Sequence, residues 1–391
     1  MSTPGRPKSE YRSAEHEGTP MTMLTNPSRP LLEEIQRLPT SGARAVEHFS
    51  VEGEDYLVIP QLAEDIAGQP ATMNGGNSDI DALVFRWADG RFVEHQRLPV
   101  PGGEDAEFFR IGDRSFLATA SLRTGRGPYD LNAHSIVFEF KQQRFVPFQT
   151  FATFAAKQWT HFTLEGRHFL ALAQGVVAEG PPAVHPSLSC LYEWNGSEFV
   201  FFQTVPSAWG YNWTFFELGG EFFLGYADHV EMSRLLKWNG TGFVPFQDLA
   251  PKGGRAMCFF EVEGEAWLAL ANLIGESFLF RWDGTQFVQH RRLCGPGARE
   301  FAWVASSGAG HLIQLNFLRG ERSAPQTALQ SCIYRMRGKQ LELVEEFSTF
   351  GAPDVCAFTI AGQRHVAVAN SLSAEVRFRT DSVVYRLHPD D

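Results

Sequence analysis

Basic side chains recur at one corresponding position of a pattern that repeats along the sequence, five residues before an anchor residue that is usually Phe. The residues at this position are, in chain order, Arg44, Glu104, Lys157, Tyr211, Arg255, Arg299 and Pro353. Four of the seven are basic in a chain of net charge −11, so their local field is opposite in sign to that of the whole protein. A ring of this kind can hold a carboxylate or a phosphate.

The residue that follows the basic position leaves two alternatives to an anion site open. It carries a side-chain oxygen in five of the seven repeats: Asp105, Gln158, Asn212, Glu300 and Asp354. These groups could pair with the neighbouring basic side chains and neutralise them. The three carboxylates, Asp105, Glu300 and Asp354, could instead hold a cation such as Ca²⁺, which takes several oxygen ligands. Apart from this Ca²⁺ hypothesis, no cofactor is expected.

Aromatic residues that other repeats lack surround Tyr211 in the sequence. Trp213 has an equivalent in Trp159, so both could pack between neighbouring repeats. Trp209 and Tyr211 lie in the preceding loop, where a packing role explains them less well. Aromatic rings beside basic groups suit a flat or apolar ligand with an anionic end. We therefore expect Trp209, Tyr211 and Trp213 to form one wall of a ligand site bounded by Arg44, Lys157, Arg255 and Arg299.

Asp228 and His229, with Glu231 two residues further on, form the most compact set of titratable residues in the chain. They are the candidate proton-transfer groups if the protein is an enzyme, and a metal site is the less favoured interpretation. The sequence contains no GxSxG motif, no P-loop and no HExxH pair. His48 and His161 each precede an anchor residue and are expected to pack between repeats.

The repeats that carry these residues predict the fold. Their anchors recur at intervals of 44 to 60 residues: Phe49, Phe109, Phe162, Phe216, Phe260, Val304 and Phe358. Each repeat contains an anchored strand ending at a Gly turn, a second apolar strand, a third strand that commonly begins with Ser, and a fourth of the type Phe-Val-Pro-Phe-Gln. This length and content are typical of a four-stranded propeller blade.

The seventh repeat stops near Leu387 without a fourth strand. The missing strand is found near the other end of the chain, where the segment 31–38 ends in Gln-Arg-Leu and Pro39 follows. The first repeat's fourth strand ends in the same four residues, from Gln96 to Pro99. The sequence therefore predicts an all-β, seven-bladed propeller over residues 30–391, closed by Leu31–Leu38, after a disordered leader at 1–29.

Composition narrows the class of function. The negative net charge argues against nucleic acid as a partner, and no apolar run is long enough to cross a membrane. The chain opens without a signal-peptide pattern, so a cytoplasmic location is expected. Its five cysteines are scattered, which predicts reduced, buried thiols.

The repeats resemble the EAR (epilepsy-associated, also called EPTP) repeat. The resemblance rests on the Phe anchor, the Leu-Ala-Leu-Ala strand, the Ser-x-x-Tyr-x-Trp strand and the Phe-x-x-Phe-Gln strand, and it covers residues 31–387. In animal extracellular members, such as the leucine-rich glioma-inactivated proteins, the propeller binds receptor ectodomains, and members can carry a channel cation. The resemblance implies a propeller. This chain has no leucine-rich repeats, so the animal function is not carried over to it.

Two classes of function fit these observations. The favoured one is a binding module whose central channel mouth holds a small anionic or aromatic ligand, or a protein. The alternative is a cofactor-independent cyclase, isomerase or lyase that uses the same funnel. Fold alone does not separate them.

Overall fold

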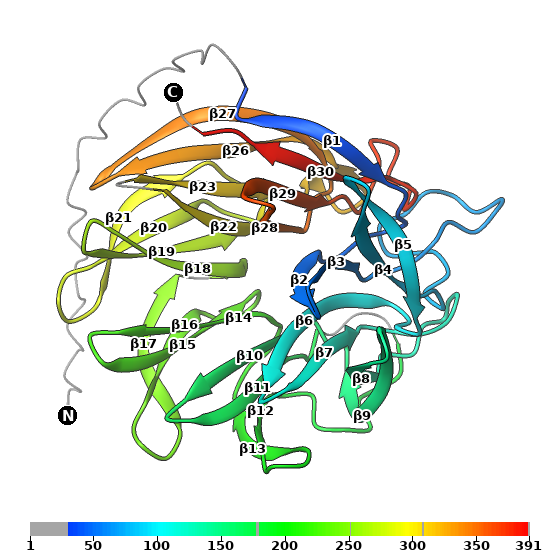
Figure 1. Ribbon diagram of the computed structural model, residues 1–391, viewed down its shortest axis with the longest axis horizontal. Helices are drawn as coiled ribbons and strands as arrows, with labels where there is room; N and C mark the ends of the chain where they lie inside the picture. The colour runs from blue at the N-terminus through cyan, green and yellow to red at the C-terminus, as the bar shows by residue number, and fades with distance from the viewer. Residues whose placement is uncertain (1–29, 177–179, 251, 307–308, 390–391) are drawn as a thin grey trace, which may run out of the picture.

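A computed structural model describes the chain except residues 1–29, 177–179, 251, 307–308 and 390–391. Seven antiparallel, four-stranded sheets surround a central axis as the blades of a propeller (Figure 1). The inner strands of successive blades contact one another around the ring, and the first also contacts the last. The seven-bladed all-β fold is thus confirmed, while the disordered leader expected at 1–29 lies outside the described residues.

The strands of each blade run in sequence from the channel outwards. Blades one to four contain β2 (Glu47–Val51), β3 (Glu54–Ile59), β4 (Ala82–Ala88), β5 (Arg91–Leu98); β6 (Gly103–Ile111), β7 (Arg114–Ser121), β8 (Asn132–Lys141), β9 (Arg144–Phe154); β10 (Gln158–Leu164), β11 (Arg167–Ala173), β12 (Ser189–Trp194), β13 (Phe199–Val205); β14 (Gly210–Leu218), β15 (Glu221–Asp228), β16 (Ser233–Trp238) and β17 (Phe243–Ala250). Blades five and six contain β18 (Gly254–Val262), β19 (Glu265–Asn272), β20 (Ser277–Trp282), β21 (Phe287–Leu293); β22 (Ala298–Ser306), β23 (Ala309–Asn316), β26 (Ala328–Arg337) and β27 (Gln340–Phe350).

Blade seven joins both ends of the chain. It consists of β28 (Asp354–Ile360), β29 (Gln363–Ala369), β30 (Ser382–Leu387) and, outermost, β1 (Leu32–Leu38). β1 pairs antiparallel with β30, so the first described strand lies beside the last (Figure 1). The predicted closure of the ring by the N-terminal segment is therefore confirmed. A further hairpin, β24 (Arg319–Glu321) with β25 (Ala324–Gln326), lies between β23 and β26, and the sequence pattern did not predict it.

The recurring Phe anchors hold neighbouring blades together by ring stacking. Phe49 stacks on Phe108 of the next blade with ring centroids 4.3 Å apart, and Phe216 stacks on Phe259 at 4.2 Å. His48 stacks on Phe358 across the closure at 4.2 Å, and His161 stacks in the same way on a Phe anchor. These contacts explain why aromatic residues recur at the anchor and just before it, and they confirm that both histidines pack between blades.

The Gln of the fourth strand makes a second repeated contact between blades. The amide of Gln96 donates to the carbonyl of Phe145 at 2.8 Å and accepts from the same residue's N–H at 2.9 Å. Gln36 of β1 makes the same pair of bonds with Phe92, at 2.7 and 2.8 Å. The shared Gln-Arg-Leu-Pro segment therefore reflects a shared structural role, because β1 joins blade seven to blade one in the way that β5 joins blade one to blade two.

Within the described residues, the structure has no helix long and apolar enough to cross a membrane.

Candidate functional site

The mouth of the central channel brings together residues at the start of the inner strands or just before them. β-Bulges occur at this position in four blades, where the ladder skips Glu104, Tyr211, Arg255 or Arg299. A bulge leaves one residue unpaired and re-aims its side chain, which is common beside functional sites. We call Arg44, Glu104, Lys157, Tyr211, Arg255 and Arg299 the mouth cluster.

Tyr211 lies at the centre of the mouth cluster. The guanidinium carbon of Arg255 is 3.9 Å from the centroid of the Tyr211 ring. The Lys157 Nζ and the Arg299 guanidinium carbon are each 5.2 Å from the same centroid. Three of the four basic residues expected to bound the site therefore converge on the aromatic residue expected to wall it.

Negative charge in the mouth cluster comes from Glu104 alone. Its Oε1 lies 3.0 Å from Lys157 Nζ and 3.6 Å from Arg44 Nε. The neutralising pairs considered from the sequence involved the residue after each basic position, but Arg44 and Lys157 instead share Glu104. In the described part of the chain neither Arg255 nor Arg299 has an ion pair, and Arg255, 6% exposed, donates to the carbonyl of Gly254 at 3.2 Å. The cluster therefore carries an excess of positive charge.

Burial and mutual repulsion act on the pKa values of these groups. Burial, together with repulsion from Arg299, lowers the pKa of Arg255 to about 10. Burial alone would raise the pKa of Tyr211, but Arg255, Lys157 and Arg299 outweigh it and bring that pKa below its usual value. Burial likewise opposes ionisation of Glu104, and Lys157 with Arg44 more than compensates, so the pKa of Glu104 is lowered. Such shifts show that the charged groups of the mouth cluster are buried and act strongly on one another.

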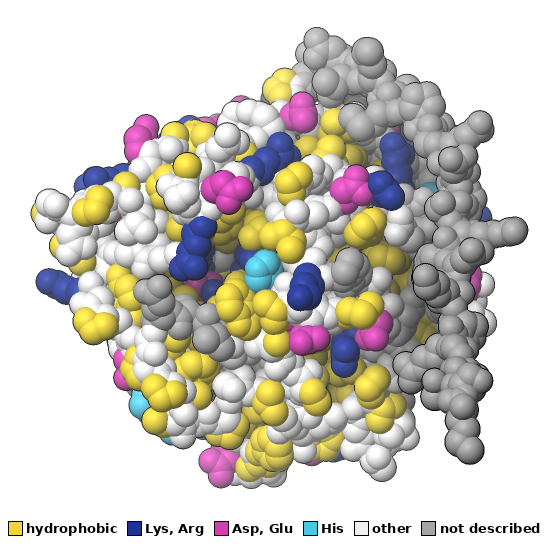
Figure 2. Space-filling model, turned by 180° about the vertical axis from the view of Figure 1, so that it is seen from behind, with side chains coloured by type: hydrophobic (Ala, Val, Ile, Leu, Met, Phe, Trp, Pro, Cys, Tyr) yellow, Lys and Arg dark blue, Asp and Glu magenta, His cyan; other side chains and the backbone are white. Residues whose placement is uncertain are grey.

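An apolar collar rims the mouth cluster. It consists of residues just after the second strand of six blades, together with Trp209: Leu62, Leu122, Val176, Leu273, Phe317 and Leu372. The Arg44 guanidinium carbon lies 5.4 Å from the Phe317 ring centroid, so cationic and apolar groups meet at this level. Figure 2 shows hydrophobic side chains beside Lys and Arg near the middle of one face of the molecule. A ligand at the mouth would meet both kinds of surface.

The three predicted wall residues have different positions. Trp209 is half-buried and stacks on His229 with ring centroids 5.5 Å apart, and Tyr211 meets the edge of the same ring at 6.0 Å. Trp213 is only 2% exposed and packs in the core between blades three and four, tilted against Tyr226 at 4.5 Å. We therefore leave Trp213 out of the proposed ligand contacts, because its indole is covered by protein.

Asp228 organises a loop. The carboxylate accepts hydrogen bonds from the backbone N–H groups of Ala208 at 2.9 Å and of Val230 and Glu231 at 2.9 Å each. Asn272 of the next blade uses its Oδ1 in the same way, toward two backbone N–H groups. Recurrence of this contact favours a structural role for Asp228, and its role in proton transfer stays a prediction.

His229 lies beside the mouth cluster. Burial, followed by repulsion from Arg255, lowers the pKa of His229 to about 4, so the imidazole is neutral at neutral pH. A neutral ring stacked on Trp209 extends the aromatic wall of the mouth.

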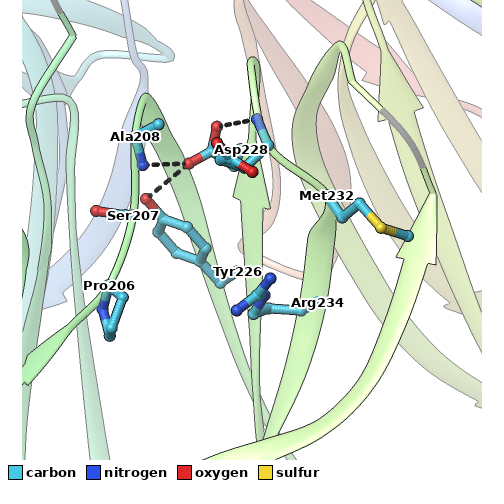
Figure 3. Close-up of a pocket in the computed structure, with 8 residues that line it drawn as sticks. Pro206, Ser207, Ala208, Tyr226, Asp228, Met232 and Arg234 are labelled. Atoms are coloured by element: carbon cyan, nitrogen blue, oxygen red, sulfur yellow. Dashed lines mark hydrogen bonds between the residues drawn. The ribbon is translucent and has the colours of Figure 1, made fainter.

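A separate pocket of about 250 Å³ opens between blades three and four. Figure 3 shows Pro206, Tyr226, Met232 and Arg234 around it, with Asp228 at one side bound to Ala208 and Tyr226. The sequence did not predict this pocket, because its walls come from three loop and strand segments with no shared pattern.

A second layer of ionisable groups lies on the inner strands beyond the mouth cluster. These inner carboxylates are Glu47, Asp105, Glu107, Glu300 and Asp354, of which the sequence analysis missed Glu47 and Glu107. The two-residue period of a strand, which places Asp105 and Glu107 on one face, could have revealed them. Burial raises the pKa of Glu107 to about 7 and that of Asp354 to about 6.

The Ca²⁺ hypothesis concerns three of the inner carboxylates. Asp105 accepts from the N–H of Trp159 at 2.8 Å, and Asp354 accepts from that of Val46 at 2.8 Å. Among the residues that the structure describes, no three His, Cys, Asp or Glu side chains form a group that could hold a metal ion. Channel Ca²⁺ at Asp105, Glu300 and Asp354 stays a prediction.

The seven four-stranded blades define the class of the protein as a β-propeller, a fold that commonly serves binding. The EPTP domain family matches residues 32–87, 91–139, 144–195, 198–239, 242–283 and 340–388, and the chain belongs to this family. The resemblance to EAR repeats noted in the sequence is thereby confirmed.

Two curated relatives agree with this family assignment, and a solved structure agrees with the fold. The chain is 30% identical to the human thrombospondin-type laminin G domain and EAR repeat-containing protein over 197 residues, which are 49% of the chain. The mouse counterpart is 31% identical over 199 residues, also 49% of the chain, and the match spans 26% of the length of each relative. The propeller domain of Cps50 (Swd1) from Myceliophteria thermophila superimposes with a TM-score of 0.56 at 8% identity, over 91% of this chain and 100% of that one, which supports the fold alone.

Proposed function

We propose that this propeller is a binding protein whose channel mouth holds a ligand with an anionic group on an aromatic or apolar body. The observation that carries the proposal is the convergence of Arg255, Lys157 and Arg299 on Tyr211, with Glu104 as the carboxylate of the cluster. Buried cations without counter-ions are costly, and a carboxylate or phosphate that enters the mouth would relieve this cost. The ligand is a small molecule or an exposed acidic segment of a protein.

The apolar collar supports the proposal that the body of the ligand is aromatic or apolar. An anionic group bound to the mouth cluster would leave its attached body beside Trp209, His229 and Phe317. Sites of mixed character, apolar with a few convergent polar groups, are typical of small-ligand pockets. The enzyme considered from the sequence is not carried forward, since Asp228 is engaged by backbone N–H groups and no observation favours turnover. A cytoplasmic location stays a prediction.

A matched series of probes tests the proposed ligand class. Benzoate should bind to the protein in isothermal titration calorimetry, and benzyl alcohol should bind at least about tenfold more weakly, because it lacks the charge-assisted hydrogen bonds. Benzylammonium should not bind, since it carries the same sign of charge as the mouth. Equal binding of benzoate and benzylammonium would overturn the proposal.

Affinity for benzoate should depend on pH on the alkaline side. Tyr211 is neutral when protonated and adds negative charge when it ionises below its usual pKa, and Arg255 loses positive charge near its pKa of about 10. Both changes remove attraction for an anion, so affinity should be constant near neutral pH and fall as the pH approaches 10. Tyr211→Phe should show a smaller fall, because only the loss of positive charge from Arg255 and Lys157, whose pKa values burial lowers, then remains. Calorimetric affinity that is unchanged over this range would contradict the assignment.

A further inference from the structure

Two cysteines distant in sequence meet where the chain enters blade six. Cys294 lies in the segment between β21 and β22, and Cys332 lies on β26. Cys332 is 2% exposed, whereas Cys294 is half-buried and packs against the same apolar cluster. Both side chains therefore lie in one apolar cluster.

The backbone of Cys294 is held in this position by neighbours of Cys332. Gln314, which pairs with Cys332 across the β23–β26 ladder, donates from Nε2 to the carbonyl of Cys294 at 2.7 Å. The N–H of Cys294 donates to the hydroxyl of Tyr334, two residues beyond Cys332, at 3.3 Å. These two hydrogen bonds fix the backbone of Cys294 beside the strand that carries Cys332.

The surroundings of Cys294 favour its thiolate form. Hydrogen bonds from Cys332 and Tyr334 lower the pKa of Cys294, against the effect of partial burial, and the charge of Arg319 acts in the same direction. Burial instead raises the pKa values of Cys190, Cys258 and Cys356. All five cysteines lie in the described residues, and Cys294 is the one whose pKa falls. A partly exposed thiolate next to a second thiol is the arrangement of a thiol–disulfide couple.

We propose that Cys294 and Cys332 form a reversible disulfide. The Cys294 thiolate attacks a small-molecule disulfide, so that one S–S bond breaks, a mixed disulfide forms and one thiolate leaves. Cys332 then loses its proton to solvent and its sulfur attacks Cys294 Sγ, which expels the second thiolate. Two protein thiols are oxidised, and the small-molecule disulfide is reduced to two thiols.

The bond would tie the entry segment of blade six to that blade's third strand. The same segment leads within a few residues to Arg299 of the mouth cluster, and it is anchored there by the N–H of Gly297, which donates to the carbonyl of Leu273 at 2.9 Å. A covalent link at Cys294 reduces the freedom of the unfolded chain and fixes this segment in the folded one. Oxidation should therefore raise the melting temperature of the protein.

Titration of the full chain with glutathione disulfide, followed by alkylation and peptide mass mapping, tests the proposal. The wild-type protein should lose two thiols and yield a cross-linked peptide pair containing Cys294 and Cys332. Cys332→Ser should retain a glutathione adduct on Cys294, and Cys294→Ser should leave Cys332 unmodified. Cys258→Ser is the matched control, since Cys258 packs against the same cluster and its pKa is raised by burial, and it should still form the cross-link.

Three results would overturn the proposal. One is a wild-type protein that keeps both thiols free in excess glutathione disulfide, and another is a stable glutathione adduct on wild-type Cys294 without a cross-link. The third is a cross-link that joins other cysteines. Circular dichroism of Cys294→Ser, a change at a half-buried position, verifies that loss of the cross-link does not come from misfolding.

Discussion

A chain that begins at Ser41 should unfold at a much lower denaturant concentration than one that begins at Pro30. The shorter chain lacks β1, and with it the burial of Leu31, Leu32 and Leu38, each of which contributes roughly 1.5–3 kcal/mol of unfolding free energy. It also exposes the edge of β30 and removes the bonds between Gln36 and Phe92 that join blade seven to blade one. Urea unfolding followed by circular dichroism measures the difference.

Point variants in β1 distinguish the loss of its packing contacts from the effect of shortening the chain. Leu38→Ala should lower the unfolding free energy by about 2–5 kcal/mol, because Leu38 is 2% exposed in the core shared by blades one and seven. Arg37→Ala, on the solvent side of the same strand, should change it by less than about 0.5 kcal/mol. Equal stability of the chains that begin at Ser41 and Pro30 would mean that β1 does not close the ring.

Arg255→Ala should weaken benzoate binding by about tenfold or more, since one buried charge-assisted contact contributes roughly 1.5–3 kcal/mol. The melting temperature should stay nearly unchanged or rise. In the described structure Arg255 has no ion pair, and its removal relieves repulsion from Arg299. Loss of binding without loss of stability distinguishes a ligand contact from a packing residue.

Arg292→Ala provides the matched control for this variant. Arg292 is on the outer strand β21, its side chain is 67% exposed, and it pairs with Glu276 and not with a residue of the mouth cluster. Both variants remove one positive charge from the protein, but only Arg255→Ala should affect calorimetric affinity by more than a small factor. Equal effects of the two variants would indicate attraction by net charge rather than a site at the mouth.

Sequence periodicity predicted the fold because each repeated residue performs the same contact in successive blades. Phe49 stacks on a ring of the neighbouring blade, and Gln96 forms hydrogen bonds with the outer strand of the next blade. Because every blade needs these contacts, the same residue types recur along the chain. The match of the segment at Gln36 to that at Gln96 revealed the closure for the same reason. The β24–β25 hairpin was missed because an insertion in one blade has no counterpart in the others.

The candidate site was predicted less completely. Equivalent positions in a closed ring lie at one level, which is why Arg255, Lys157 and Tyr211 could be brought together from spacing alone. Trp213 was misplaced because a one-residue bulge after Gly210 separates its environment from that of Tyr211.

Side-chain contacts between different strands lie outside what repeat spacing encodes. The sequence predicted a proton-transfer role for Asp228 from its neighbours in the chain. One of its hydrogen bonds instead comes from Ala208, in the loop that connects blade three to blade four. The approach of Cys294 to Cys332 depends on the path of the segment into blade six, so the scattered cysteines gave no signal of it.

The central claim, an anion site at the channel mouth, is tested most directly by a crystal structure with bound 4-bromobenzoate. The account predicts the carboxylate within hydrogen-bond distance of Arg255 and Arg299, with the anomalous bromine peak beside Trp209 and His229. A bromine peak in the separate pocket beside Tyr226 and Met232, with none at the mouth, would contradict it.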